Sequence, residues 1–375
     1  MKLINFDVTL ISFGYDFCVC VCKNGVFSWG NNTFGQLGIG NNDIQYLPRQ
    51  IEFFKNPEEI ISLCCGAYSC VCHCKSEILS WGINHFGELG IGNRSNQSSP
   101  QKILFFQKYD EIISICCGAY FCVCVCKNEV FSWGHNYAGQ LGIGNFESQF
   151  FPQQILFFKK PQKITSISCG RDFCICIYKN EVFSWGRNCS GELGIGNSCS
   201  QSSPQQILFF KNTEEIISLC CGGGFCVCIC NNGVFSWGSN LLGQLGIGNN
   251  DNQFSPQQIS FFENPKEIIS LCCGNEFCVC ICKNGIFKWG NNAEKQLQIG
   301  YKIHQKTNIL SPQRIFLEKN IESFYEYSFP QTSTYNNRMI KLLLMLIREF
   351  SDPDKCLLGK YYLPLDLFKL LLKLI

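Results

Sequence analysis

Short apolar runs alternate with polar turns along the chain, and the same pattern returns six times. In its third copy the runs are "EIISICC", "FCVCVC", "VFSW" and "QQILFF", the last at residues 153–158. Runs of four to eight β-branched and aromatic residues between turn residues predict β-strands. "KNG" between the second and third runs of the first copy favours a hairpin, because Asn and Gly tolerate positive φ. No run has the length and period of a helix, so each copy predicts four strands.

A fixed period relates the copies. All six tryptophans recur every 52 residues: Trp29, Trp81, Trp133, Trp185, Trp237 and Trp289. The prolines keep this step from Pro48 to Pro256, and Pro312 follows after 56, which indicates a four-residue insertion in the last copy. Four strands in each of six units of about 50 residues are typical of a β-propeller. Stacked blades cover their middle strands on both sides, which explains a run that is apolar throughout.

The predicted fold is therefore all-β: a β-propeller of six complete four-stranded repeats plus a partial seventh, at residues 320–329, with a short C-terminal α-helical tail. The propeller spans residues 1–329 and the tail residues 330–375, with helices expected at 338–350 and 363–375. Whether the ring closes on six blades, keeps a remnant of a seventh or belongs to a truncated chain stays open at this stage.

Composition narrows the class of protein. Apolar residues make up 46% of the 375 positions, charged residues 16%, and the net charge is +2. This balance lacks the basic footprint of a nucleic-acid-binding protein. No apolar run reaches the ~18 residues that predict a membrane span. We expect a monomer that binds no nucleic acid and has no membrane span.

Cysteine is unusually frequent, with 29 residues. The count is odd, the chain is long, and Asp7 interrupts the apolar start without a following cleavage signal. We therefore expect reduced thiols and a cytoplasmic location, with the nucleus left open.

Alternation along a strand gives most of these thiols a structural role. In the run at residues 17–22 the three cysteines share one face and Phe and Val share the other. They are expected to pack as small apolar groups against a neighbouring blade. Two alternatives remain: zinc binding near residues 72–74, where His73 would point away from its flanking cysteines, and oxidation of vicinal pairs at 64–65 and 116–117.

The glycine-rich loop "GQLGIG", or "GELGIG" in the second and fourth copies, follows each tryptophan except the last, whose copy reads "KQLQIG". A phosphate-binding loop is usually built once, on a turn from strand to helix, whereas this loop recurs without a following helix. Its first glycines are Gly35, Gly87, Gly139, Gly191 and Gly243. They are expected to supply positive φ and close backbone approach, with Leu37 and Ile39 as apolar plugs. Asn32 and its equivalents are expected to form local turns.

The repeat "VFSWGxNxxGQLGIGN…P" resembles that of the regulator of chromosome condensation family over roughly residues 6–318. The resemblance implies a propeller, seven-bladed in that family. Its members include a chromatin-bound exchange factor for the GTPase Ran, ubiquitin ligases with added HECT domains, and interaction propellers. That exchange factor carries a wedge inserted in one blade, and five consecutive steps of 52 residues leave no room for one here.

Positions that vary between copies predict where a partner binds, because a rigid scaffold presents loops. The fourth copy is the most charged, so the predicted partner-binding residues are Arg171, Asp172 and Arg187, joined by His135 and Tyr137. No catalytic, cofactor-binding or metal-ligating set is predicted. The predicted function is a non-enzymatic protein–protein interaction propeller. The alternatives are a guanine-nucleotide exchange factor for a small GTPase and a ubiquitin-ligase adaptor that uses the C-terminal helices, the second of which faintly resembles the opening helix of an F-box.

Overall fold

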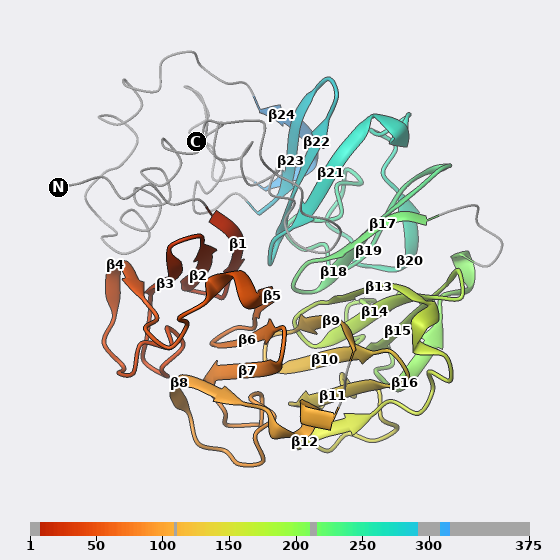
Figure 1. Cartoon of the computed structure of the whole chain (residues 1–375). Coiled ribbons are helices and arrows are strands. Elements are labelled where there is room, and N and C mark those ends of the chain that lie inside the picture. The colour runs from red at the N-terminus through yellow and green to blue at the C-terminus, as the bar shows by residue number, and fades with distance from the viewer. Residues whose placement is uncertain (1–7, 109–110, 211–215, 292–307, 316–375) are drawn as a thin grey trace, which may run out of the picture.

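Six four-stranded antiparallel sheets make up the computed structural model, which describes residues 8–108, 111–210, 216–291 and 308–315. The sheets are the blades of a β-propeller and fan out around a common centre (Figure 1). Strands follow one another within each blade in chain order. The first strands of successive blades pack side by side, β1 on β5, β5 on β9, β9 on β13, β13 on β17 and β17 on β21. The prediction of six four-stranded blades is confirmed.

Blades 1 to 3 contain β1 (Val8–Phe13), β2 (Phe17–Cys22), β3 (Gly25–Gly30) and β4 (Gln45–Gln50); β5 (Ile60–Cys65), β6 (Ser69–Cys74), β7 (Glu77–Gly82) and β8 (Gln97–Lys102); and β9 (Ile112–Cys117), β10 (Phe121–Cys126), β11 (Val130–Gly134) and β12 (Gln149–Gln154). Blades 4 to 6 contain β13 (Ile164–Cys169), β14 (Phe173–Tyr178), β15 (Glu181–Gly186) and β16 (Gln201–Gln206); β17 (Ile216–Cys221), β18 (Phe225–Cys230), β19 (Gly233–Gly238) and β20 (Gln253–Gln258); and β21 (Ile268–Cys273), β22 (Phe277–Cys282), β23 (Gly285–Gly290) and β24 (Ile309–Ile315).

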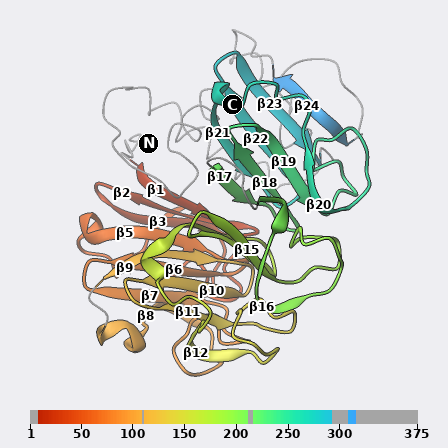
Figure 2. The same ribbon diagram turned by 90° about the vertical axis from the view of Figure 1, so that its right-hand side faces the viewer.

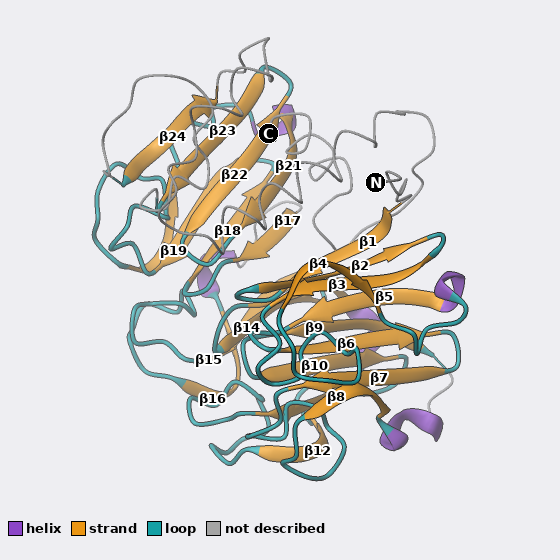
Figure 3. Ribbon diagram, turned by 90° about the vertical axis from the view of Figure 1, so that its left-hand side faces the viewer, coloured by secondary structure: helices purple, strands orange, loops and turns teal. Residues whose placement is uncertain are grey.

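Short 3-10 turns, purple in Figure 3, complete the described secondary structure. They are η1 (Pro57–Glu59), η2 (Leu104–Lys108), η3 (Pro161–Lys163), η4 (Leu208–Phe210) and η5 (Pro265–Glu267). Within the described ranges, no helix has both the length and the apolar character needed to cross a bilayer.

The core lies between neighbouring sheets, which stack one on the next (Figure 2). The apolar face of β2, formed by Phe17, Val19 and Val21, shares one buried cluster with Cys70 and Cys72 of β6. The same contact of Phe and Val or Ile with cysteines recurs between blades 3 and 4, 4 and 5, and 5 and 6. Cysteine therefore packs as a small apolar side chain against the preceding blade, as predicted.

A tryptophan hydrogen bond and a closely packed glycine join neighbouring blades. The buried indole N–H of Trp81 donates to the carbonyl of Gln36 in blade 1, at 3.0 Å. Gly38 has φ +69°, and a Cβ there would lie 2.7 Å from the Trp81 Nε1 atom. Trp133, Trp185, Trp237 and Trp289 make the equivalent bond to Glu88, Gln140, Glu192 and Gln244 at 2.9 to 3.0 Å. The repeated glycines are thus architectural.

The predicted fourth strand is wrong in position. In blade 3 the strand β12 ends at Gln154, and the predicted run at 153–158 continues into a turn in which Ile155 N–H donates to Val130 O at 2.8 Å. Phe158 then turns inward and is buried. The outermost strand pairs with β11 alone and is mostly unburied, and such an edge strand accommodates Pro152. The apolar run marks the turn that anchors this strand.

Asn32 does more than form a local turn. Its buried side-chain amide donates to the carbonyls of Asn41 and Asp43, and its carbonyl accepts the Leu37 N–H at 2.9 Å. It therefore ties together the whole glycine loop. The predicted partial seventh repeat at 320–329 and the helical tail at 330–375 lie outside the described residues.

Substituting two glycines of one loop would distinguish the cost of backbone strain from the cost of a steric clash with the tryptophan. Gly142 and Gly144 both have positive φ, but a Cβ on Gly142 would lie 2.7 Å from Trp185 Nε1, while one on Gly144 would have 3.8 Å of room. Alanine in the left-handed region costs ~1–2 kcal/mol at either site. We expect Gly142→Ala to lower the free energy of unfolding by a further ~1–3 kcal/mol. Urea titration followed by tryptophan fluorescence would measure the free energy of unfolding. Equal losses in Gly142→Ala and Gly144→Ala would contradict close packing of Gly142 against Trp185.

Candidate functional site

Two kinds of variable loop meet at one end of every blade. In blade 4, the Arg187 N–H donates to the carbonyl of Asp172 at 2.9 Å. The equivalent bond links the residue after Trp-Gly to the turn between the first two strands in all six blades, at 2.8 to 3.0 Å. The two sets of positions that vary between the repeats are therefore neighbours. We call the surface that they form the loop face.

Backbone hydrogen bonds fix these loops relative to one another. The Arg171 N–H donates to Gly223 O, and Ala119 N–H donates to Arg171 O, each at 2.9 Å. Equivalent bonds continue from Tyr15 to Ala67 to Ala119 and from Gly223 to Asn275. Each blade thus holds the turn of the next in register, and the side chains of the loop face project from a continuous hydrogen-bonded arc.

The loop face has an aromatic half on blades 1 to 3. Tyr15 and Tyr68 make an edge-to-face contact with ring centroids 5.6 Å apart. The chain of ring contacts continues through Phe86, which lies 4.5 Å from the His135 ring, and His135 lies 4.6 Å from Tyr137. Phe34, His85 and Tyr120 join the same cluster. Tyr137 is 71% exposed, so the cluster reaches solvent.

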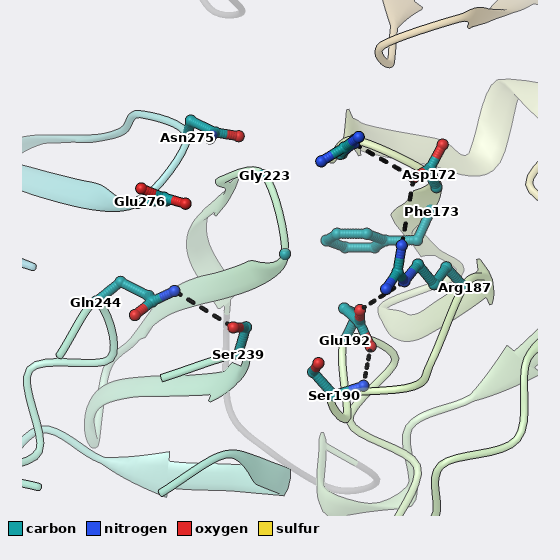
Figure 4. Close-up of a pocket in the computed structure, with 12 residues that line it drawn as sticks. Asp172, Phe173, Arg187, Ser190, Glu192, Gly223, Ser239, Gln244, Asn275 and Glu276 are labelled. Atoms are coloured by element: carbon teal, nitrogen blue, oxygen red, sulfur yellow. Dashed lines mark hydrogen bonds and ion pairs between the residues drawn. The ribbon is translucent and has the colours of Figure 1, made fainter. Parts of the chain in front are cut away.

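A charged pocket occupies blades 4 to 6 beside the aromatic half. It holds about 160 Å³ and is lined by Arg171, Asp172, Phe173, Arg187, Ser190, Glu192, Gly223, Gly224, Ser239, Gln244, Asn275 and Glu276. Figure 4 shows Arg187 between Asp172 and Glu192, with Gln244 and Glu276 on the opposite side.

A partly buried and a buried carboxylate position the two arginines. Arg187 Nη1 lies 3.9 Å from Asp172 Oδ2, and its Nε lies 3.5 Å from Glu192 Oε1. Arg171 Nε is 3.7 Å from the same Asp172 oxygen. The carboxylates of Asp172 and Glu192 are 14% and 4% exposed, whereas the arginine side chains are 55% and 46% exposed. The guanidinium groups thus reach the pocket rim while anions hold them from below.

Burial governs the protonation of the acids in this layer. It raises the pKa of Glu192, which Arg187 partly offsets. Glu88 occupies the same repeat position in blade 2 and has no arginine ion pair among the described residues. Its Oε2 accepts the Phe86 N–H at 2.8 Å, and its buried Oε1 finds no partner in the described ranges. Burial raises the pKa of Glu88 to about 7.

The structure places the five predicted residues close together. Arg171, Asp172 and Arg187 line the pocket. His135 lies at its edge, with Nδ1 4.0 Å from Asp172 Oδ1 and 2.8 Å from the Gln140 amide nitrogen, and burial lowers the pKa of His135. Tyr137 belongs to the aromatic cluster and does not line the pocket.

Sequence reasoning missed the acids of the glycine loop and of the opposite wall, namely Glu88, Glu192 and Glu276. Glu88 and Glu192 stand where other copies have Gln, as in Gly-Glu-Leu against Gly-Gln-Leu. The alternation of Glu and Gln at this position could have indicated a site. It was overlooked because the glycines and leucine around it have a structural role in every copy.

These features define the class of protein: a repeat β-propeller whose variable side chains gather on one rigid face. A family model for the RCC1-like domain matches residues 2–328, and the chain belongs to that family. The resemblance seen in the repeat is thereby confirmed.

Individual relatives share the propeller in different settings. The chain is 29% identical over 305 residues to the ultraviolet-B receptor UVR8 of Arabidopsis thaliana, covering 79% of this chain and 68% of UVR8. It is 27% identical over 283 residues to the human E3 ubiquitin-protein ligase HERC2, covering 73% of this chain but only 6% of HERC2.

Solved structures support the fold. Human WBSCR16 superposes with a TM-score of 0.70 at 22% identity, covering 84% of this chain and 83% of that one. Yeast RCC1 (Prp20) in complex with Kap60 gives a TM-score of 0.70 at 20% identity, covering 82% and 75%.

Glu88 predicts a pH dependence of stability. Because burial raises its pKa from 4.5 to about 7, the folded state binds this proton more tightly than the unfolded state does. Below pH 4.5 Glu88 is protonated in both states, and its contribution to the free energy of unfolding is at its maximum. That contribution falls by up to ~3 kcal/mol as the pH rises from 4.5 to about 7. Glu88→Gln, the residue of blades 1, 3 and 5, should be more stable than the wild type at pH 8 and equal to it at pH 4.5.

Urea titrations at a series of pH values would measure this difference. Glu147→Gln is the matched control, since Glu147 is exposed and its loss changes the net charge equally. If the two variants show the same pH profile, Glu88 does not carry the buried proton.

Proposed function

We propose that this chain is a non-enzymatic protein–protein interaction propeller, and that it binds its partner through the charged pocket of the loop face. One observation carries the proposal: two half-exposed guanidinium groups, of Arg171 and Arg187, stand at the rim of a pocket and pair with the partly buried carboxylate of Asp172 and the buried carboxylate of Glu192.

Preorganisation is the physical advantage of this arrangement. An arginine that is ordered only on binding loses side-chain entropy worth ~0.5–1.5 kcal/mol. Here the ion pairs and the hydrogen-bonded arc already restrict Arg187. Asp172 and Glu192 occupy one side of the guanidinium, which leaves N–H groups for carboxylate or carbonyl oxygens of a partner. Arginines of this kind are enriched among residues that dominate binding energy.

The aromatic half supplies the second part of the surface. Exposed aromatic side chains such as Tyr15 and Tyr137, at 47% and 71% exposure, offer large contact areas with few rotatable bonds. A partner that contacts both halves would present an acidic or carbonyl-rich segment beside an apolar one. The proposal keeps the expectations of a monomer, a cytoplasmic location and no catalytic role. The surroundings of His135 support a role without catalysis. Its ring contacts the amide of Gln140 and the carboxylate of Asp172, neither of which is a nucleophile that a histidine would activate.

Two other partner classes are outcomes of the same test. The solved structure of Prp20p concerns binding to Gsp1p and histones, and HERC2 is a ubiquitin ligase. The similarity to Prp20p, at 20% identity, shows a shared fold only. The similarity to HERC2 covers a small part of that protein. Exchange on a small GTPase and a ligase-adaptor role therefore remain alternatives, and the predicted adaptor helices lie outside the described residues.

Replacing both arginines tests the site. We expect Arg171→Ala/Arg187→Ala to weaken a specific partner at least ~10-fold, because each arginine at an interface centre contributes ~1–2 kcal/mol or more. Affinity purification of wild type and variant, with mass spectrometry of bound proteins and a titration of each candidate, would measure the loss.

Arg49→Ala is the control, since Arg49 is an exposed arginine on the outer strand of blade 1. A partner retained by this control and lost by the double variant supports the site. Equal recovery by all three proteins removes the charged pocket from the proposal. A nucleotide-release assay and a search for cullin components among the bound proteins separate the alternatives.

A further inference from the structure

Cysteine pairs stand at the base of five loop-face turns. Each pair joins the last residue of a blade's first strand to the second residue of its second strand. The Sγ atoms lie 2.8 Å apart in Cys65–Cys70, 2.7 Å in Cys117–Cys122, 3.0 Å in Cys169–Cys174, 3.2 Å in Cys221–Cys226 and 3.4 Å in Cys273–Cys278. These separations are shorter than the ~3.5–4.0 Å at which carbon atoms pack. Blade 1 has Phe13 opposite Cys18 and lacks the pair.

The register places each pair where a disulfide fits. Gly170 N–H donates to Phe173 O at 2.9 Å, one step nearer the turn than Cys169 and Cys174. Hydrogen-bonded and non-hydrogen-bonded pairs alternate along an antiparallel ladder, so the two cysteines face each other in a non-hydrogen-bonded position, with Cα atoms ~4.5 Å apart. Disulfides span Cα separations of ~4.4–6.8 Å, so closure needs no backbone movement.

Other thiol neighbours are poorer candidates. Cysteines two apart in one strand, such as Cys72 and Cys74, have Sγ atoms 3.8 Å apart, and their Cα atoms are ~6.6 Å apart, near the limit for a disulfide. The vicinal pairs considered from the sequence, such as residues 64–65, point to opposite faces of their strand. Within each blade the cross-strand pairs are therefore the favoured partners. Between blades, Cys116 Sγ accepts the Cys169 N–H at 3.2 Å and is a competing neighbour.

We infer that these five pairs are sites of oxidative modification, at which a hydroperoxide converts two opposed thiols into a cross-strand disulfide. The thiolate of one cysteine takes the terminal oxygen of the hydroperoxide, which leaves as an alcohol or water, and becomes a sulfenic acid. The sulfur of the facing cysteine then attacks the sulfenic sulfur, the S–S bond forms, and water leaves with the thiol proton. Two thiols are oxidised and one hydroperoxide is reduced.

Burial makes this reaction slow. It raises the pKa of the Cys169 thiol well above its usual range, and the pKa of Cys174 to about 11. Few thiolates are present at neutral pH, so the pairs should react after the exposed Cys189 and Cys199. Cys169 is partly exposed and Cys174 is buried, which makes Cys169 the first of the two to be oxidised.

Blade 4 links the modification to the proposed binding site. Its cysteine pair brackets the turn that carries Arg171 and Asp172. If the proposed function holds, the disulfide closes the base of the turn that presents them. The chemical claim itself does not depend on any partner.

Trypsin gives a direct test, because Arg171 lies between the paired cysteines. The native full chain is exposed to hydrogen peroxide, denatured with N-ethylmaleimide and digested without reductant. We expect the peptides 164–171 and 172–179 to be joined through Cys169 and Cys174, with maleimide on Cys176, and to separate after reduction. Cys176→Ser should keep the link and Cys174→Ser should lose it.

Several results would overturn the inference. They are full maleimide labelling of Cys169 and Cys174 after Cys189 and Cys199 have been oxidised, a link to Cys176 instead of Cys174, or sulfinic acid on Cys169 without a link. The wild-type peptide map decides the matter even if Cys174→Ser fails to fold. Formation of the link in a protein that binds no partner through Arg171 would refute the proposed function alone.

Discussion

The hydrogen bond from an indole N–H to the main-chain carbonyl of the preceding blade holds this propeller together. It joins Trp81 to Gln36 and recurs at four further interfaces with nearly the same length. Both partners are buried, and a buried polar group left unpaired costs ~1–3 kcal/mol. The glycine beside the carbonyl is required because the indole occupies the space of a side chain. One interaction thus explains two of the repeated residue types.

The same interaction sets a condition on the first blade. Trp29 is buried like the other tryptophans, but its N–H has no acceptor among the described residues. At the other five blades the acceptor comes from the preceding blade in the chain.

The fold was predictable from sequence because its determinants recur six times with fixed spacing. Tryptophan, glycine and the apolar second strand each depend on contacts that every blade repeats, so their roles follow from periodicity. The outer strand was misplaced because it is a largely unburied edge strand, while the apolar run after it, including Ile155 and Phe158, anchors a turn. The cross-strand cysteine pairs required the register of two strands, which the pattern of apolar residues does not specify.

The candidate site was predictable only in part, and the reason lies in how one residue serves two purposes. At the position of Gln36, Glu88, Gln140, Glu192 and Gln244 the main-chain carbonyl accepts the indole bond, which any residue type can provide. The side chain faces the loops instead, where an acid pairs with Arg187 in blade 4 and burial raises the pKa of the acid in blade 2 to about 7. Because the backbone carries the structural role, the residue type at this position can change between blades while the indole bond is kept, although a buried acid there lowers stability when it ionises. A scaffold position thereby determines the electrostatics of the loop face.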